Sequence, residues 1–452
     1  MCGQPSNCGD VALLNQLDGF SIPFDGAIDP STVNNNTVFV IRIADTSNPI
    51  TFNPQIVGIN QVVWDTLTNT LFVKSDLQLD QHTTYLLIVT KGVHDSAGDP
   101  IEADDSFVNF RHTLNFGQTK DHQLKSYRKT LNNLLDDDVL ATLAPGLLSS
   151  DIAVASVFTT GSVTSTLEKI RDQIKSASAP TASFNLGTHG ESTVFPVASI
   201  SGILFGQQQN IVGPLNTVPV PTPALQVFTG AVAKVAFGKF SAKNFETAGG
   251  FIPAVPTRTG VPAVQSTGDV YFNLFIPAGT RPANGWPAAI FAHGLSNNKN
   301  SSPFAVASTL AHSGIATLSI NSVGHGFGPA GTLTVIQGTG SVVLSAGGRG
   351  VDLNSSGTID SFEGLIATGA QIDIAARDGV QQTVADLRQV VRMIQGGVDV
   401  DNTGSASLDS NRIYMFGQSL GGVIGTVFMG IEPDIKAGVP IVPGGTSVDV
   451  AR

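Results

Sequence analysis

A serine stands between two glycines in the last part of the sequence, in Gly417-Gln418-Ser419-Leu420-Gly421. A serine hydroxyl attacks a carbonyl carbon when a neighbouring base takes its proton, and an acyl-serine intermediate forms. Glycines at these two places allow a strand and a helix to meet at a sharp corner where a Cβ atom would clash. The pattern therefore predicts Ser419 as a catalytic nucleophile, with Gly417, Gln418 and Gly421 supporting the corner.

The flanking residues predict the two elements that hold this serine. Arg412–Phe416 is a short apolar β run, and Leu420–Gly430 has the apolar and small residues typical of a buried helix. The amide of Leu420 would be the first of that helix. Because a helix N-terminus carries partial positive charge, this amide would stabilise a developing oxyanion.

A second oxyanion amide is predicted in the turn Ala292-His293-Gly294-Leu295-Ser296, which follows an apolar strand. We expect Leu295 to supply the amide, Gly294 to permit the turn, and His293 to hold the loop by hydrogen bonding. His325 follows the next predicted strand, and we expect it to line or support the cleft. A role for either histidine as the catalytic base is the less favoured alternative.

An acidic stretch between residues 352 and 363 predicts a structural calcium site. Oxygen-bearing residues recur with the spacing of an EF-hand loop, with Gly357 at the sixth place. The predicted ligands are Asp352, Asn354, Ser356, Thr358, Asp360 and Glu363. A solvated loop without metal is the alternative. A fainter copy without the terminal glutamate precedes the serine strand, and its weaker candidates are Asp399, Asp401, Thr403 and Asp409.

The composition limits the classes of partner. The chain has 452 residues, enough for two or three domains, and 41% of them are apolar, enough for a sizeable core. Only 13% are charged and the net charge is −11, which argues against nucleic acid and against anionic membranes as electrostatic partners. No apolar run is long enough to span a membrane, and no signal peptide is visible. Cys2 and Cys8 would form a disulfide or remain free thiols.

The order of β and helical patterns predicts a multidomain chain of four segments. Residues 1–115 should form an all-β sandwich, and residues 116–177 a helical joint. Residues 178–267, rich in Pro, Gly, Thr and Val, should form a β-rich covering segment. In residues 268–452 strands alternate with helices, which predicts an α/β core with a parallel sheet. Expected strands of the sandwich are Thr37–Ile43, Val62–Trp64, Thr70–Lys74, Thr84–Thr90 and Phe107–Arg111.

The elements expected in the α/β core place Ser419 at the carboxyl end of its strand, where open α/β sheets have their sites. The expected strands are Val270–Pro277, Pro287–Ala292, Ile315–Asn321, Arg412–Phe416 and Ala437–Pro443. The expected helices are Pro303–His312, Ala375–Ile394 and Leu420–Gly430.

Two resemblances add to these predictions. Phe24–Val33 and Gly92–Pro100 resemble the bacterial Ig-like module of surface proteins. Ala292–Leu295 and Phe416–Gly422 resemble the oxyanion turn and nucleophile elbow of the α/β-hydrolases, and with Ala375–Leu387 they make the chain similar to the large bacterial extracellular lipases of the virulence-factor type. The resemblance implies hydrolysis of lipid or acyl-ester substrates in a secreted or surface protein, without an organic cofactor.

The chain departs from this resemblance in one respect. The α/β-hydrolases carry their triad in the order serine, acid, histidine, whereas all eight histidines here precede Ser419. We therefore expect an incomplete core whose acid and base come from a missing C-terminal segment, with Asp449 a weaker candidate for the acid. A polyester or polyhydroxyalkanoate depolymerase with the same mechanism is an alternative, as is a non-catalytic surface or adhesion protein with a relic hydrolase domain.

Overall fold

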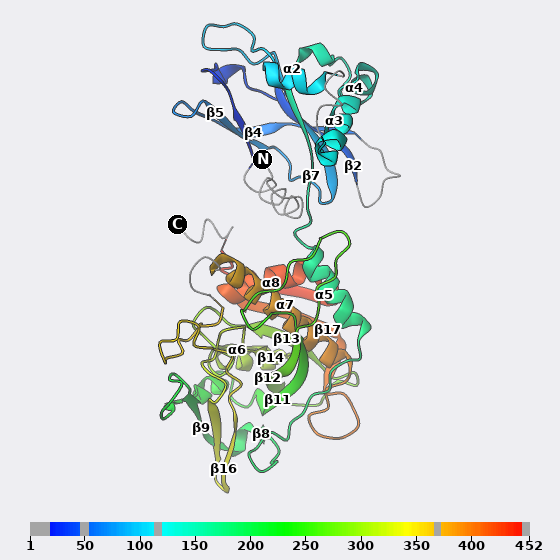
Figure 1. Cartoon of the computed structure of the whole chain (residues 1–452). Helices are drawn as coiled ribbons and strands as arrows, with labels where there is room; N and C mark the ends of the chain where they lie inside the picture. The colour runs from blue at the N-terminus through cyan, green and yellow to red at the C-terminus, as the bar shows by residue number, and fades with distance from the viewer. Residues whose placement is uncertain (1–18, 46–53, 113–119, 366–371, 445–452) are drawn as a thin grey trace. The chain divides into compact units, whose positions relative to one another are not determined.

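The computed structural model describes residues 19–45, 54–112, 120–365 and 372–444. The chain forms two compact units (Figure 1). The first runs to Ser165 and includes Pro256–Gly260, and the second consists of Thr166–Val255 and the chain from Val261 on. The sequence-based boundaries at residues 115 and 177 fall inside these units. None of the helices in the described ranges is long and apolar enough to cross a membrane.

Two antiparallel sheets form the core of the first unit, with the orders β1-β5-β4 and β3-β2-β6-β7. Side chains from both sheets, including Ile22, Val40, Leu71 and Tyr85, are buried together. The strands are β1 (Phe20–Pro23), β2 (Val38–Asp45), β3 (Gln55–Val57), β4 (Ile59–Asp65), β5 (Thr70–Ser75), β6 (Thr83–Thr90) and β7 (Ile152–Thr159).

Helices cover the outer face of the four-stranded sheet. Val38 and Val40 of β2 pack with the other sheet, whereas Phe39 and Ile41 pack in a separate cluster with the helices. Burial of both faces explains why this strand is a continuous apolar run instead of an alternating one. The helical elements are η1 (Pro30–Thr32), α2 (Asp105–Arg111), α3 (His122–Leu134), α4 (Asp137–Leu143) and η3 (Ser149–Asp151).

The predicted strand at Phe107–Arg111 is wrong, because these residues belong to α2. Asp104 caps the helix by accepting the Ser106 N–H at 2.7 Å. Phe107 and Phe110, three residues apart, both pack toward the core, as helical spacing allows. The helical joint in turn contains the unpredicted strand β7, which pairs with β6 and so belongs to the first unit.

Seven strands form the main sheet of the second unit, in the order β18-β17-β13-β14-β12-β11-β8. β13 is parallel to β14 and β17, and β17 is parallel to β18. The sheet is mixed, not all-parallel as expected, because β12 runs antiparallel to β11 and β14. The strands are β8 (Val194–Pro196), β11 (Val232–Asn244), β12 (Ser266–Pro277), β13 (Trp286–Ala292), β14 (Ala316–Ile320), β17 (Leu408–Gln418) and β18 (Ile435–Ile441).

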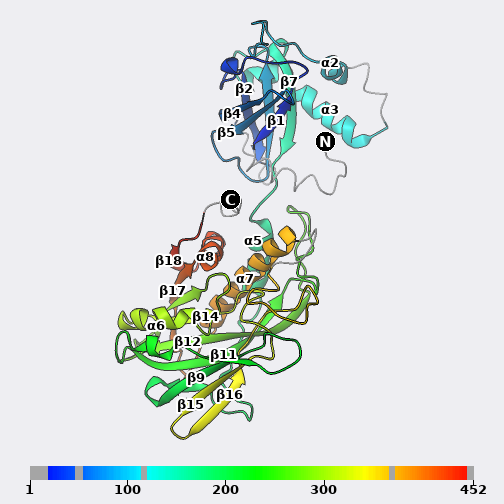
Figure 2. The same cartoon turned by 90° about the vertical axis from the view of Figure 1, so that its left-hand side faces the viewer.

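Helices cover both faces of this sheet, and Figure 2 shows α6 and α7 on opposite sides of β14. On one face Phe304 of α6 packs edge-on against Phe275 of β12, with ring centroids 4.9 Å apart. On the other face Val384 of α7 and Phe428 of α8 are buried against the strands. The helices are α5 (Ser165–Ser176), α6 (Ser302–His312), α7 (Ile372–Gln395) and α8 (Leu420–Ile431).

A second antiparallel sheet, in the order β10-β9-β15-β16, packs on the α6 side through Phe205 and Leu333. The predicted covering segment supplies two of its strands but also supplies β8 and β11 to the main sheet. The core therefore begins before residue 268, because β11 pairs with nearly the whole of β12. The remaining elements are β9 (Ile200–Gln207), β10 (Asn216–Pro219), β15 (Thr332–Gln337), β16 (Gly340–Ser345), η4 (Val197–Ser199) and η5 (Thr222–Gln226).

Candidate active site

Ser419 lies at the corner between β17 and α8. Its φ of 53° and ψ of −121° form a left-handed conformation that is rare for residues other than glycine. Its N–H donates to the Ile441 carbonyl at 2.9 Å, and its own carbonyl accepts the N–H of Gly422 at 2.7 Å. The side chain is exposed. Such strain persists where the surrounding structure imposes it, and it clusters at functional sites.

Close contacts around the corner leave no room for side chains. A Cβ on Gly417 would lie 2.1 Å from the Gly421 carbonyl oxygen, and a Cβ on Gly421 would lie 2.1 Å from that of Ala292. A Cβ on Gly422 would lie 2.9 Å from the carbonyl oxygen of Ile441. Helix α8 can therefore start against the ends of β13 and β18 only because these residues are glycines.

The predicted oxyanion loop lies beside Ser419. β13 pairs with β17 so that Ala292 is opposite Gly417, and the two strands end together. A Cβ built on Gly294 would lie 3.4 Å from the Ser419 Cβ and 4.0 Å from its Oγ. The Leu295 N–H has no acceptor among the described residues. Leu420 is the first residue of α8, so its N–H has no acceptor within the helix. These two amides remain the predicted oxyanion donors.

His293 is fully buried at the base of this loop. The Ser322 N–H donates to its Nε2 at 3.1 Å, so Nδ1 carries the proton and donates to the Gly294 carbonyl at 2.9 Å. Burial, followed by the neighbouring His325, lowers the pKa of His293 to about 3. A neutral ring with both nitrogens engaged is unsuited to take a proton from Ser419. Its hydrogen bonds instead tie the loop to the residues that follow β14.

His325 is also fully buried, and its ring centroid lies 5.1 Å from that of His293. Its Nδ1 donates to the Val323 carbonyl at 2.8 Å, whereas Nε2 is buried without a hydrogen-bond partner in the described residues. Burial lowers the pKa of this imidazole. These contacts place His325 among the residues that support the loop, not on an exposed cleft wall.

The base and acid that would activate Ser419 are not among these contacts. Within the described ranges, no side chain is hydrogen-bonded to the Ser419 Oγ. Asp449, the weaker candidate for the acid, lies outside the described residues, as do Cys2 and Cys8. A base and an acid downstream of the serine therefore stay a prediction from the order of triad residues in the α/β-hydrolases, which the sequence resembles.

The predicted calcium loop is a closed turn held by its own amides. Asp352 accepts the N–H of Ser356 at 2.9 Å and of Gly357 at 2.8 Å, and Glu363 accepts the N–H of Leu353 at 2.9 Å. In the described part of the chain, no group of three His, Cys, Asp or Glu side chains is arranged to hold a metal. Calcium binding there stays a prediction for Asp352, Asn354, Ser356, Thr358, Asp360 and Glu363.

The acidic residues before β17 and at its start form ion pairs and hydrogen bonds. Asp401 pairs with Lys234, and Asp409 pairs with Arg412 at 2.6 Å. Asp399 accepts the N–H of Gly404 at 2.6 Å and the hydroxyl of Thr403 at 3.4 Å. Two of the four weaker calcium candidates are thus engaged by cations, which does not favour a metal site in this turn.

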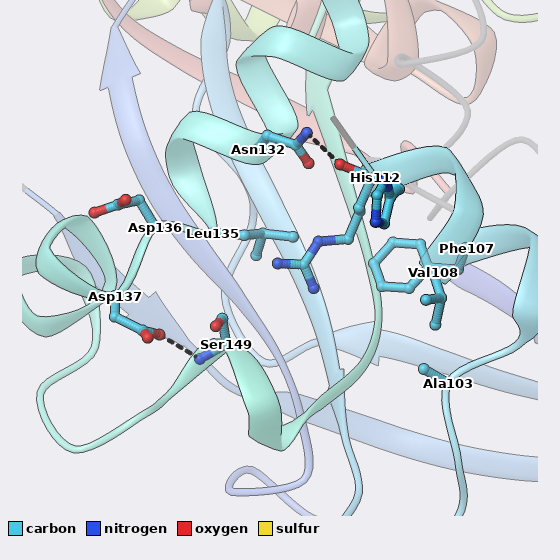
Figure 3. Close-up of a pocket in the computed structure, with 10 residues that line it drawn as sticks. Ala103, Phe107, Val108, His112, Asn132, Leu135, Asp136, Asp137 and Ser149 are labelled. Atoms are coloured by element: carbon cyan, nitrogen blue, oxygen red, sulfur yellow. Dashed lines mark hydrogen bonds between the residues drawn. The ribbon is translucent and has the colours of Figure 1, made fainter. Parts of the chain in front are cut away.

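A pocket of about 470 Å³ lies in the first unit among α2, α3 and α4 (Figure 3). Asn132 donates to the Arg111 carbonyl at 2.9 Å, and Asp137 accepts the Ser149 N–H at 2.7 Å. No residue of the Ser419 corner or of the oxyanion loop lines this pocket. Its lining residues are Ala103, Phe107, Val108, Arg111, His112, Asn132, Leu135, Asp136, Asp137 and Ser149.

One polar group near the site was not predicted. Lys299, four residues after Leu295, is 1% exposed, and its neighbours Asn298 and Asn300 are buried as well. A run of asparagine and lysine normally marks an exposed loop, so the sequence did not predict burial here. The only signal was position, since the run directly follows the predicted oxyanion turn.

A comparison with known protein families supports the predicted Ig-like fold of the first unit. Residues 10–112 match the family described as bacterial Ig-like domain, which confirms the Ig-like prediction for these residues. No curated protein matches the chain.

The solved structures with similar regions include several esterases. An acetyl xylan esterase from Paenibacillus sp. R4 is 15% identical over 48% of this chain and 56% of its own, with a TM-score of 0.27. A putative acetyl xylan esterase from Bacteroides fragilis is 12% identical over 60% and 50%, with a TM-score of 0.30. A cold-adapted esterase from an Arctic intertidal metagenomic library is 14% identical over 45% and 59%, with a TM-score of 0.25.

The matched regions span little more than half of each of these solved chains. Similarity at this level does not establish a function. The assignment of the site therefore rests on the geometry around Ser419.

Proposed function

We propose that this chain carries the nucleophile, Ser419, of a serine carboxylic-ester hydrolase that acts through an acyl-enzyme. The observation that carries the proposal is the left-handed backbone of an exposed serine at a strand-to-helix corner, with φ of 53°. The adjacent Gly294 turn, where an added Cβ would lie 3.4 Å from the Ser419 Cβ, supports a reaction at that point. Corners of this kind present a nucleophile above the end of a sheet.

In the proposed reaction, the Ser419 Oγ attacks the ester carbonyl carbon while a base takes its proton. The carbonyl oxygen becomes an oxyanion, which the Leu295 and Leu420 amides stabilise by hydrogen bonding. The C–O bond to the alcohol breaks and the alcohol leaves with the proton, so that an acyl-serine remains. Water then attacks the acyl-serine by the same route, releasing the carboxylic acid and restoring the hydroxyl.

Exposed apolar residues near the serine support an acyl chain as part of the substrate. Leu295 is 47% exposed, and Val442 is 70% exposed. Val442 follows Ile441, whose carbonyl accepts the Ser419 N–H. Water-exposed apolar side chains of this kind favour contact with an apolar ligand. We therefore expect longer acyl esters, such as p-nitrophenyl butyrate and octanoate, to be better substrates than p-nitrophenyl acetate.

The Ig-like first unit supports a location outside the cytoplasm, because bacterial Ig-like domains are typical of extracellular and surface proteins. We propose a secreted or surface hydrolase for lipid or acyl-ester substrates. A lipase of the virulence-factor type is the specific form of this proposal. A polyester depolymerase is distinguished by turnover of a polymer film in preference to soluble esters.

The test is covalent labelling of the protein, as its gene encodes it, with a fluorophosphonate probe. We expect one labelled serine, Ser419, and no labelling of Ser419→Ala. Ser296→Ala is the matched control, because Ser296 is also exposed and has a left-handed backbone in the adjoining loop. This control should keep its labelling. Labelling that survives Ser419→Ala would show that another serine reacts and would exclude Ser419 as the nucleophile. A wild type that is never labelled would exclude the proposed enzyme and favour a non-catalytic surface protein.

A further inference from the structure

Lys299 is a buried lysine in the loop between β13 and α6. Its Nζ donates to the Oδ1 atoms of Asn273 at 3.0 Å and Asn300 at 3.1 Å. No described Asp or Glu forms an ion pair with it. Burial lowers the pKa of this amine to about 7. A lysine kept in the interior without a carboxylate partner is costly, which indicates a role that its hydrogen bonds serve.

The backbone of Lys299 is fixed as firmly as its side chain. Its N–H donates to the Asn321 Oδ1 at 2.8 Å, and its carbonyl accepts the Asn273 Nδ2 at 2.8 Å. Asn273 belongs to β12, and Asn321 directly follows β14. Asn321 is itself held, since its Nδ2 donates to the Gly347 carbonyl at 2.8 Å. Lys299 therefore bonds the loop to β12 and to the residue that follows β14.

Leu295 lies between two such anchors. On one side, His293 accepts the Ser322 N–H and donates to the Gly294 carbonyl. On the other side, Lys299 holds the loop to β12 and to the residues after β14. The segment between them is short, and Leu295 itself is exposed with no hydrogen bond from its amide to the described chain. The direction of that amide depends on the two anchors.

We propose that Lys299 is a positioning residue of the oxyanion loop, which holds the Leu295 amide toward the group that reacts at Ser419. This inference rests on the proposed function. Lys299 touches neither the substrate nor the serine in this role. A preorganised donor stabilises an oxyanion without reorganising during the reaction, and a loosened donor loses that advantage.

Lys299→Met tests the proposal, because methionine has similar length and no donors. Lys239→Met is the matched control: Lys239 lies on β11 of the same sheet and forms a partly exposed ion pair with Asp269. The rate of fluorophosphonate labelling is measured against probe concentration. In Lys299→Met we expect the maximal labelling rate to fall about tenfold or more, and the half-saturating concentration to change less than about twofold. Lys239→Met should leave both unchanged.

Hydrogen exchange of the peptide that spans residues 293–301 supplies a readout that does not depend on activity. We expect it to exchange roughly tenfold faster in Lys299→Met, while peptides from β13 keep their protection. Unchanged exchange in this peptide, or faster exchange with an unchanged maximal labelling rate, would overturn the proposal. If the wild type is not labelled at all, the proposed hydrolase fails, and the exchange experiment still decides whether Lys299 anchors the loop.

If Lys299→Met does not fold, hydrogen exchange of the wild-type protein tests whether Lys299 anchors the loop. The Lys299 N–H should then exchange as slowly as the amides of β13, because its acceptor is the buried Asn321. If the Lys299 N–H exchanges as fast as the amides of an exposed loop, Lys299 does not anchor the loop and the proposal is wrong.

Discussion

The backbone of Ser419 is held in a conformation that glycine adopts with less strain. We expect Ser419→Gly to abolish labelling and to stabilise the protein by up to about 1 kcal/mol, since it relieves the left-handed strain while the N–H keeps its bond to the Ile441 carbonyl. Urea unfolding of the variant and the wild type measures the difference. A clear loss of stability would show that the serine side chain itself supports the corner.

Gly421 is required because α8 lies in close contact with the end of β13, not because its backbone has a positive φ. A Cβ there would lie 2.1 Å from the Ala292 carbonyl oxygen, so Gly421→Ala should destabilise the protein by about 2 kcal/mol or more. Gly430, later in the same helix, would place a Cβ in open space. Gly430→Ala should therefore be neutral, or stabilising by up to about 1 kcal/mol through helix propensity. Equal thermal shifts in the two variants would contradict the contact argument.

At the scale of elements, the turn after β11 carries a buried acid beneath α7. Burial raises the pKa of Glu246 from 4.5 to about 7, with Arg349 opposing the shift. Between these values the folded protein keeps a proton that the unfolded chain releases. Glu246 therefore makes stability fall as pH rises from about 4.5 to about 7, by up to about 1.4 kcal/mol per pH unit.

Comparison with Glu246→Gln isolates this effect. The pKa of His293, lowered to about 3, makes stability rise with pH up to its ordinary value of 6.5, in the opposite direction. Both proteins contain His293, so the difference between their unfolding free energies reports Glu246 alone. We expect the variant to gain relative stability steadily between pH 4.5 and 7. A difference that does not change with pH would mean that Glu246 is ionised in the folded protein.

The loop from Asp352 to Glu363 is expected to bind calcium as an element that stabilises the fold. Calcium at 100 times its Kd would add about 2.7 kcal/mol to the free energy of unfolding. A chelator should then lower the melting temperature, and Glu363→Gln should remove most of the response. Asp399→Asn, in the separate acidic turn, is the control and should keep it. If neither the chelator nor Glu363→Gln changes the melting temperature, the loop is a metal-free turn closed by its own amides.

At the scale of the whole molecule, the 452 residues contain no histidine after Ser419. His293 and His325 are buried, and the described residues give the Ser419 Oγ no hydrogen-bond partner. We therefore expect the 452-residue chain alone to hydrolyse p-nitrophenyl butyrate only at a residual rate, since an oxyanion hole without a base retains little catalysis. His325→Ala should not lower that rate. Ordinary esterase rates that His325→Ala abolishes would identify His325 as the base.

Much of the site followed from local sequence. The glycines around Ser419 impose a corner through the volume of a missing Cβ, and that constraint acts over a few residues. The apolar run before His293 predicted β13, because a short continuous apolar run is typical of a buried strand. Local patterns also predicted the strands β4 and β5 and the long helix α7.

The tertiary structure decided which segments meet, and with that the burial of polar groups. β7 joins the first unit because it pairs with β6, a strand distant in sequence, and β11 joins the main sheet by pairing with β12. Lys299 is buried because Asn273 of β12 accepts from its Nζ and Asn321, which follows β14, accepts its backbone N–H. Asp401 is engaged by Lys234, a residue more than a hundred positions earlier in the chain. Hydrogen bonds and ion pairs between distant segments depend on the assembled sheet, which no window of the sequence contains.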